Sequence, residues 1–142
     1  MFPKKISPEN LNSLTKNTIL SHLGIEFIEI KNDTIIAKMP VNQYTSQPAG
    51  ILHGGASVTL AESIGSIGSY MLINSELESA VGLEVNANHL KSISSGFVFG
   101  IGSIIHKGRS THVWSIRIVD ENDRLISVSR LTVMIIKKAE KK

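Results

Sequence analysis

The feature that most constrains the fold of this chain is one long segment with helical periodicity. No proline interrupts the sequence between about Gly54 and Ile73, and apolar side chains recur there every three to four positions. These side chains are Leu60, Ile64, Ile67 and Met71. We therefore expect one long helix, and no other predicted element is large enough to cover a sheet.

Six apolar, β-branched segments surround this helix and are predicted to be strands. The connections between consecutive strands are too short for a parallel crossover, which needs about a dozen residues, so the neighbours are antiparallel. The expected strands are Leu23–Ile30, Thr34–Val41, Ala80–Lys91, Gly96–His106, Thr111–Asp120 and Arg124–Lys137. The sequence therefore predicts an α+β fold in which an antiparallel sheet of about six strands curls around the central helix.

The length of 142 residues is enough for one core and too short for two ordinary domains, so we expect a single domain over residues 1–142. Ser7 and Pro8 have the chemistry of a helix start, which predicts a capping helix within residues 1–20. The lysine-rich residues 137–142 are expected to form a basic, solvated tail.

Charge and composition argue against several partners. The 15 basic residues are dispersed among 12 acidic ones, and only 5% of residues are aromatic, so we expect no nucleic-acid binding. No apolar run reaches the roughly 18 residues of a membrane span. The first ten residues have no secretory leader, which makes the cytoplasm the expected location.

The predicted helix has a second face of small and polar residues around one carboxylate. This face consists of Gly55, Thr59, Glu62, Ser66 and Ser69. Glu62 either points to solvent or lies in a cleft, where its small neighbours would leave room for a ligand. We favour the second interpretation because the helix is otherwise apolar.

Two glycines lie in the interior of the same helix. Gly65 and Gly68 each cost about 1 kcal/mol relative to alanine at such positions. We therefore expect a neighbouring backbone or a ligand to approach the helix closely there.

A glycine-rich turn, Gly50–Gly55, comes directly before the helix. Unpaired N–H groups and the positive end of the helix dipole meet at such a turn, which suits a developing oxyanion. Glu62 is expected about 12 Å from Gly54 along the helix axis, so an extended substrate could contact both. The amide of Gln47, in the preceding loop, can donate to a carbonyl and accept from water.

Other chemistries fit the sequence less well. The segment Ala61–Gly65 is one substitution away from the G-x-S-x-G elbow of serine hydrolases, but it lies inside the helix. The five histidines, at positions 22, 53, 89, 106 and 112, include no pair at zinc-ligand spacing, so we expect no metal site.

The segment Gln47–Ser66, QPAGILHGGASVTLAESIGS, closely resembles the helix motif of the hotdog-fold acyl-CoA thioesterases. The resemblance continues through GLEVNANHLKS (82–92) and HKGRSTHVW (106–114), and so covers nearly the whole domain. It is strongest to the branch that acts on aromatic acyl-CoA thioesters, which includes the phenylacetate-type, 1,4-dihydroxy-2-naphthoyl-CoA and enterobactin proofreading thioesterases. The resemblance implies the hotdog fold.

The resemblance also implies roles for individual residues. In the family, the carboxylate that matches Glu62 activates water or attacks the thioester carbonyl, and the N–H that matches Gly54 polarises that carbonyl. Gln47 and His53 would position the thioester and water, and Ser66 would assist the water or the carboxylate. Such enzymes place each active site across a homodimer interface, often within a homotetramer, so Glu62 would work with Gln47 and His53 of the other subunit.

By the same resemblance, basic and polar residues would hold the nucleotide end of coenzyme A. The matching residues here are His89, Lys91, His106 and Arg109. No metal or redox cofactor is implied, because coenzyme A is part of the substrate.

The leading hypothesis is therefore an acyl-CoA thioesterase for aromatic or medium-length acyl groups. A base or nucleophile facing an oxyanion donor is what thioester hydrolysis requires. Two alternatives stay open on the same fold: a hydratase or dehydratase of acyl thioesters, and a non-catalytic acyl-CoA-binding protein.

Overall fold

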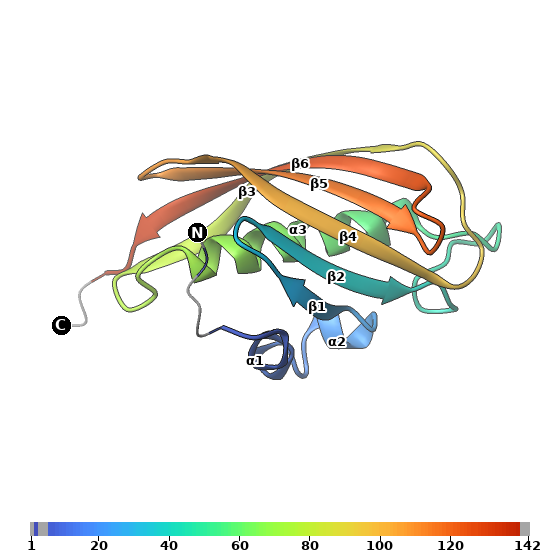
Figure 1. Cartoon of the computed structure of the whole chain (residues 1–142), viewed down its shortest axis with the longest axis horizontal. Helices are drawn as coiled ribbons and strands as arrows, with labels where there is room; N and C mark the ends of the chain where they lie inside the picture. Colours follow the sequence, from blue (N-terminus) through green and yellow to red (C-terminus); the bar gives the residue numbers. More distant parts are fainter. Residues whose placement is uncertain (1, 3–5, 140–142) are drawn as a thin grey trace.

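The computed structural model of this chain describes residue 2 and residues 6–139, and its centre is the helix α3 (Gly54–Met71). A six-stranded sheet arches over this helix (Figure 1). Its strands are β1 (Glu26–Ile30), β2 (Thr34–Pro40), β3 (Glu78–His89), β4 (Phe97–Lys107), β5 (Thr111–Asp120) and β6 (Leu125–Lys137). The predicted α+β architecture, with its six strands and one long helix, is confirmed.

The strands lie in the order β1-β2-β4-β5-β6-β3, and every neighbouring pair is antiparallel. The chain leaves α3 and enters β3, which pairs only with β6 among the described strands and forms one edge of the sheet. This placement matters for the site, because the last residues of β3 return to the start of α3.

The core forms between α3 and the concave face of the sheet. In β5, Trp114, Ile116 and Ile118 have no exposed surface, whereas Ser115 and Arg117 between them are exposed. This alternation confirms the predicted strand with one covered face.

The two interior glycines of α3, Gly65 and Gly68, make room for the side chain of Trp114. The prediction that a backbone or a ligand approaches the helix there is wrong. A Cβ atom added to Gly65 would lie 2.5 Å from Leu131 Cδ2 and 3.1 Å from Trp114 Cγ. One added to Gly68 would lie 2.5 Å from Trp114 Cζ2. The indole ring therefore packs directly on the helix backbone, which explains both glycines.

Ser69 also departs from the prediction, because it does not belong to the polar face around Glu62. Its side chain is fully buried, and its hydroxyl accepts a hydrogen bond from Trp114 Nε1 at 2.9 Å. Helical spacing alone assigned Ser69 to the wrong side, since it does not say where along the helix the sheet makes contact.

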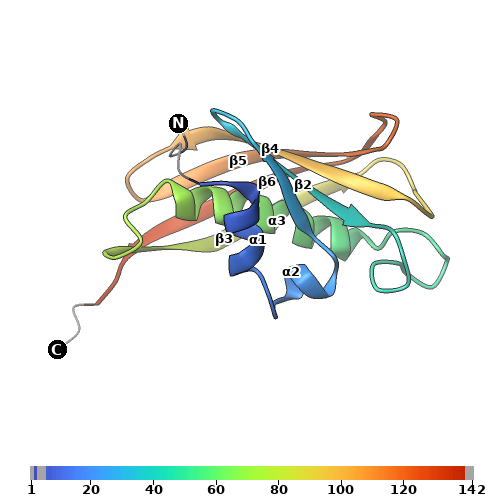
Figure 2. The ribbon, with the colours of Figure 1, turned by 60° about the horizontal axis from the view of Figure 1, so that its bottom comes forward.

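Two short helices precede the sheet, and Figure 2 brings both into view in front of α3. The helix α1 (Pro8–Leu14) starts at Ser7, whose side chain accepts from the backbone N–H of Asn10, as predicted. The second helix, α2 (Ile19–His22), was not predicted. It lies between α1 and β1 in the chain and, as described below, borders the candidate site.

The predicted basic tail, residues 137–142, begins inside the fold. Lys137 is the last residue of β6, and the Lys138 ammonium donates a hydrogen bond to the Ser75 carbonyl at 2.6 Å. Residues 140–142 lie outside the described residues. Among the helices that the structure describes, none is long and apolar enough to cross a membrane.

Candidate functional site

The loop before α3 folds into a tight turn that places Gln47 beside the start of the helix. The Gln47 N–H donates to the Ile51 carbonyl at 2.9 Å, and the Gly50 N–H donates to the Gln47 carbonyl at 2.9 Å. Gly50 adopts the left-handed conformation that this turn requires, with φ of +77°. The Gln47 side-chain oxygen accepts from the Ala49 N–H at 2.7 Å, which leaves the side-chain NH₂ group to donate elsewhere.

The first turn of α3 has one N–H capped and one free. His53 is the N-cap, and its Nδ1 accepts a hydrogen bond from the Gly55 N–H at 2.7 Å. A neutral imidazole that accepts at Nδ1 carries its proton on Nε2, so Nε2 is a donor. The Gly54 N–H has no hydrogen-bond partner among the described residues. It is therefore available for an oxyanion at the positive end of the helix dipole.

The imidazole of His89, at the end of β3, lies close to the first residue of α3. A Cβ atom added to Gly54 would lie only 2.8 Å from His89 Nε2. The His89 side chain is exposed and its ring can rotate aside, so packing alone does not require glycine at position 54. The contact shows that the end of β3 and the start of α3 lie side by side.

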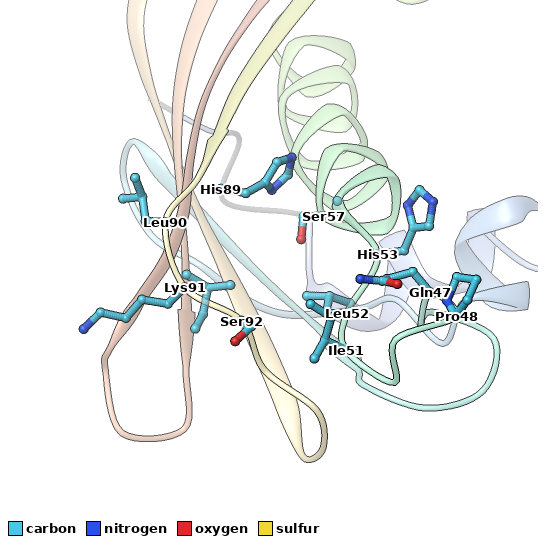
Figure 3. A pocket seen from close by; sticks show the side chains of 12 residues that line it. Gln47, Pro48, Ile51, Leu52, His53, Ser57, His89, Leu90, Lys91 and Ser92 are labelled. Atoms are coloured by element: carbon cyan, nitrogen blue, oxygen red, sulfur yellow. The ribbon is translucent and has the colours of Figure 1, made fainter.

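These groups border a cavity of about 600 Å³. Figure 3 shows Gln47 and His53 on one side of it and His89 and Lys91 on the other. The structure thus brings together five residues that the sequence analysis selected: Gln47, His53, Gly54, His89 and Lys91.

Ser57 lines the same cavity and was missed by the sequence analysis. Ser57 is only 2% exposed, and its hydroxyl has no hydrogen-bond partner within the described part of the chain. Ser57 follows Gly54 by three positions and so lies on the same side of the helix. That spacing was the signal that could have identified it.

Glu62 lies in a second hollow, further along α3, of about 390 Å³. Its side chain is half-buried, and the Glu62 carboxylate occupies the space that a Cβ atom of Gly82 in β3 would fill. No hydrogen bond or ion pair to another described residue holds this carboxylate. Glu62 is therefore neither on an open polar face nor neutralised by a partner, which leaves it available for chemistry.

The hydroxyls around Glu62 differ in whether they are already bonded. Thr59 donates to the Gly55 carbonyl at 2.9 Å, and Ser63 donates to the Thr59 carbonyl at 2.6 Å. Ser66 lines the hollow one turn beyond Glu62, and its hydroxyl makes no hydrogen bond to the described residues. Ser66 is therefore the hydroxyl that is free to act with the carboxylate.

The two hollows are separate within one chain. Glu62 does not border the cavity at Gly54, and the two residues are about 12 Å apart along the helix axis. The oxyanion donor and the carboxylate therefore do not converge within a single subunit.

His106 and Arg109 are not brought to either hollow. Both lie where β4 turns into β5, and Figure 1 shows this turn at the end of the molecule opposite the start of α3. Of the four predicted coenzyme A residues, one chain therefore gathers only His89 and Lys91. Within the described residues, no group of three or more His, Cys, Asp or Glu side chains could hold a metal ion.

Residues 49–127 match the family model of the thioesterase superfamily. The 1,4-dihydroxy-2-naphthoyl-CoA hydrolase of Escherichia coli is 46% identical over 136 residues, which cover 96% of this chain and 99% of that protein. The crystal structure of a thioesterase from Haemophilus influenzae superposes with a TM-score of 0.93 and 44% identity, and covers 99% of each chain.

One relative leaves part of this chain unmatched. A thioesterase variant from Staphylococcus aureus superposes with a TM-score of 0.80 and 40% identity over 82% of this chain and 97% of that chain. Roughly a fifth of this chain therefore has no counterpart in a structure that is itself matched almost completely.

Proposed function

This chain belongs to the thioesterase superfamily and has the hotdog fold, and on that premise we propose that it hydrolyses acyl-CoA thioesters of aromatic or medium-chain acids. Hydrolysis of thioesters is the activity of the superfamily. The identity of the acyl-CoA and the roles of the residues are our proposal. The name of the Escherichia coli relative, a hydrolase of an aromatic acyl-CoA, supports the substrate class.

The observation that carries the proposal is the free Gly54 N–H at the start of an 18-residue helix. His53 caps Gly55, and the neighbouring Gly54, which borders the cavity, keeps a free N–H at the positive end of the helix dipole. A thioester carbonyl placed there would have its oxygen stabilised as negative charge develops. The Gln47 NH₂ and the His53 Nε2–H are further donors at the same place.

Glu62 supplies the base in this proposal. Its carboxylate takes a proton from water, the hydroxide attacks the carbonyl carbon, and the Gly54 N–H stabilises the resulting oxyanion. The intermediate then collapses, the C–S bond breaks, and the thiolate of coenzyme A takes the proton back from Glu62. In direct attack by Glu62, a C–O bond forms, the C–S bond breaks and the thiolate of coenzyme A leaves with a proton from water; water then hydrolyses the resulting anhydride to the free acid and regenerates Glu62. Ser66 holds the water or the carboxylate in either case. No metal or redox cofactor takes part in these steps.

We propose that the complete site forms between two subunits paired along β3. This strand is 12 residues long, contains no proline and has an unpaired edge that exposes Val81 and Leu83. Such an edge favours pairing with another strand. Antiparallel pairing of two copies would place the His89 end of the partner's β3 beside the half of β3 that contains Gly82. The free Gly54 N–H of the partner subunit would then approach Glu62.

The same pairing gives His106 and Arg109 a place in the site. Reversing the partner's strand brings its β4–β5 turn to the end of the molecule where His89 and Lys91 lie. We propose that Lys91, together with His106 and Arg109 of the partner subunit, binds the nucleotide end of coenzyme A. Exposed Met134 and Ile136, which alternate with buried residues along β6, offer a surface for pairing two dimers into a tetramer.

The test is hydrolysis of benzoyl-CoA by the Glu62→Gln variant, which keeps the shape of the side chain and removes the base. We expect kcat to fall by about 10²–10⁴-fold. Glu76→Gln is the matched control, because Glu76 is an exposed carboxylate outside both hollows. Release of free thiol, measured against hydration of an enoyl thioester, separates hydrolysis from the hydratase alternative. Near-native hydrolysis by Glu62→Gln would show that the proposed mechanism is wrong.

A further inference from the structure

The short helix α2 is next to Glu62, although it precedes the sheet in sequence. The hollow that contains Glu62 and Ser66 is bordered by Ile19 and Leu20 of α2 and by Ile67 of α3. The polar groups therefore come from α3 alone, and two of the three large apolar groups come from α2. The mixture of an apolar wall and a few polar groups is typical of a small-molecule site.

Several hydrogen bonds hold α2 in this position. A helix of four residues is not stable by itself, so its position depends on these contacts. The Thr18 hydroxyl donates to the Thr15 carbonyl at 2.6 Å and accepts from the Leu20 N–H at 3.3 Å. At the other end, the Ile25 N–H donates to the Leu20 carbonyl at 2.8 Å. The wall is therefore fixed before a ligand arrives.

The two apolar residues of this wall differ in burial. Leu20 is half-buried and packs against the core, whereas Ile19 is 57% exposed at the rim of the hollow. Folding alone does not require a large apolar side chain at such an exposed position. Ile19 and Leu20 together give the hollow one apolar side, which suits contact with an apolar part of a substrate.

We propose that Ile19 and Leu20 select the acyl group by closing one side of the pocket beside Glu62. This inference rests on the proposed function, because it assumes that the acyl carbonyl is placed at Glu62. The hollow has a volume of about 390 Å³, at the small end of ligand sites, so a wall along one side of it would favour a compact ring over an extended chain.

Ile19 and Leu20 precede β1 and so lie outside the sheet and outside α3. A substrate filter on such a segment can vary while the strands and α3 keep the chemistry unchanged.

The test compares kcat/KM for benzoyl-CoA and dodecanoyl-CoA in Ile19→Ala, Leu20→Ala and the double variant. Removing the wall is expected to shift the ratio of the two values toward dodecanoyl-CoA by about tenfold or more. Ile19→Trp is expected to shift it the other way. Leu14→Ala is the matched control, because Leu14 is 63% exposed on α1 and borders neither hollow.

Binding measurements separate this inference from the proposed mechanism. Dissociation constants of both acyl-CoAs, measured by calorimetry on Glu62→Gln with and without the α2 substitutions, report selection without turnover. If Glu62→Gln is inactive and the α2 substitutions change the ratio of the two dissociation constants by less than twofold, the wall is wrong and the mechanism stands. If Glu62→Gln is fully active and the α2 substitutions still shift this ratio, the mechanism is wrong and the wall stands. Ile19→Val, which removes one methylene at an exposed site, gives the smaller shift if Leu20→Ala does not fold.

Discussion

The two hollows along α3 are built in different ways. In the cavity at Gly54 the donors are close in sequence and are fixed by local hydrogen bonds, the turn at Gln47 and the cap at His53, while the end of β3 forms the opposite side. The hollow at Glu62 is formed by residues far apart in sequence, from α2, α3 and β3, and its carboxylate is held by no hydrogen bond. The first hollow is suited to presenting fixed N–H donors. The second is suited to binding the part of the substrate that varies, the acyl group.

The largest expected effect tests whether these two hollows act together across subunits. Glu62→Gln removes the base, and Gly54→Pro removes the N–H at the first helical position, where proline is tolerated, so each variant alone should lose about 10² of its activity or more. If the groups come from different subunits, a mixed dimer of the two variants contains one site in which both are native. Random mixing should then restore about a quarter of the wild-type activity.

The measurement is the rate of benzoyl-CoA hydrolysis after the two variants are unfolded together and refolded in equal amounts. Each variant refolded with itself is the control and should stay inactive. Activity that does not return in the mixture, although size-exclusion chromatography shows dimers, would place Glu62 and Gly54 of one subunit in the same site. The two hollows would then act together within one subunit.

A smaller effect tests the donor in the first hollow. Gln47→Ala removes both the NH₂ donor and the oxygen that holds the turn at Ala49, whereas Gln47→Glu keeps the oxygen and removes the donor. If the NH₂ group acts on the substrate, both variants should lower kcat/KM by about tenfold, the effect of one hydrogen bond. Gln43→Ala, in the same loop and outside the cavity, should be silent. Native activity in Gln47→Glu would limit Gln47 to holding the turn.

The difference between the hollows also explains what the sequence could predict. The start of α3 at Gly54 and the bounds of β5, Thr111–Asp120, were predicted correctly. Both depend on local patterns, a glycine turn and a strict alternation. The grouping of Gln47, His53 and Gly54 is local in the same sense.

The errors came from contacts between distant parts of the chain. Ser69 was placed on the wrong side of α3 because its partner, Trp114, lies 45 residues later. The purpose of Gly68 was misjudged for the same reason. The helix α2 has only four residues, too few for a periodic pattern, and tertiary contacts hold it. The substrate wall beside Glu62 was therefore not visible in the sequence.

A third prediction concerns His112, a buried histidine outside both hollows. Its substitution should change stability without changing acyl selectivity, which provides a reference for the variants in the hollows. His112 is 2% exposed, and its Nδ1 has no hydrogen-bond partner within the described residues. Burial lowers the pKa of His112 below its ordinary value of 6.5, and the charges of Lys107 and His106 lower it further, against the opposing effect of Glu78. The folded protein therefore keeps His112 neutral at a pH at which the unfolded chain takes up a proton.

The sign of the effect follows from proton linkage. Below pH 6.5 the unfolded chain binds the proton more readily than the folded protein, so stability falls as the pH is lowered toward the folded pKa. This site contributes a slope of at most about 1.4 kcal/mol per pH unit. Urea unfolding of His112→Leu between pH 5 and pH 8 should show a smaller slope than the wild type. An unchanged slope would mean that His112 does not titrate differently on folding, and acyl selectivity should not change in either case.

The smallest expected effect tests whether the position of α2 is what makes the second hollow selective. Thr18→Ala removes the hydroxyl that caps α2 and bonds to the Thr15 carbonyl, which should lower the free energy of unfolding by about 0.5–1 kcal/mol. Ser7→Ala removes the equivalent cap of α1 and should cost a similar amount. Only Thr18→Ala should shift the ratio of dodecanoyl-CoA to benzoyl-CoA hydrolysis, by about twofold, because only α2 borders the hollow. Thr18→Ser keeps the hydroxyl and should restore the native ratio. Equal shifts in Thr18→Ala and Ser7→Ala would assign the change to general loosening of the segment before β1. The contrast between a first hollow with local donors and a second hollow with a wall from α2 would then lose its structural basis.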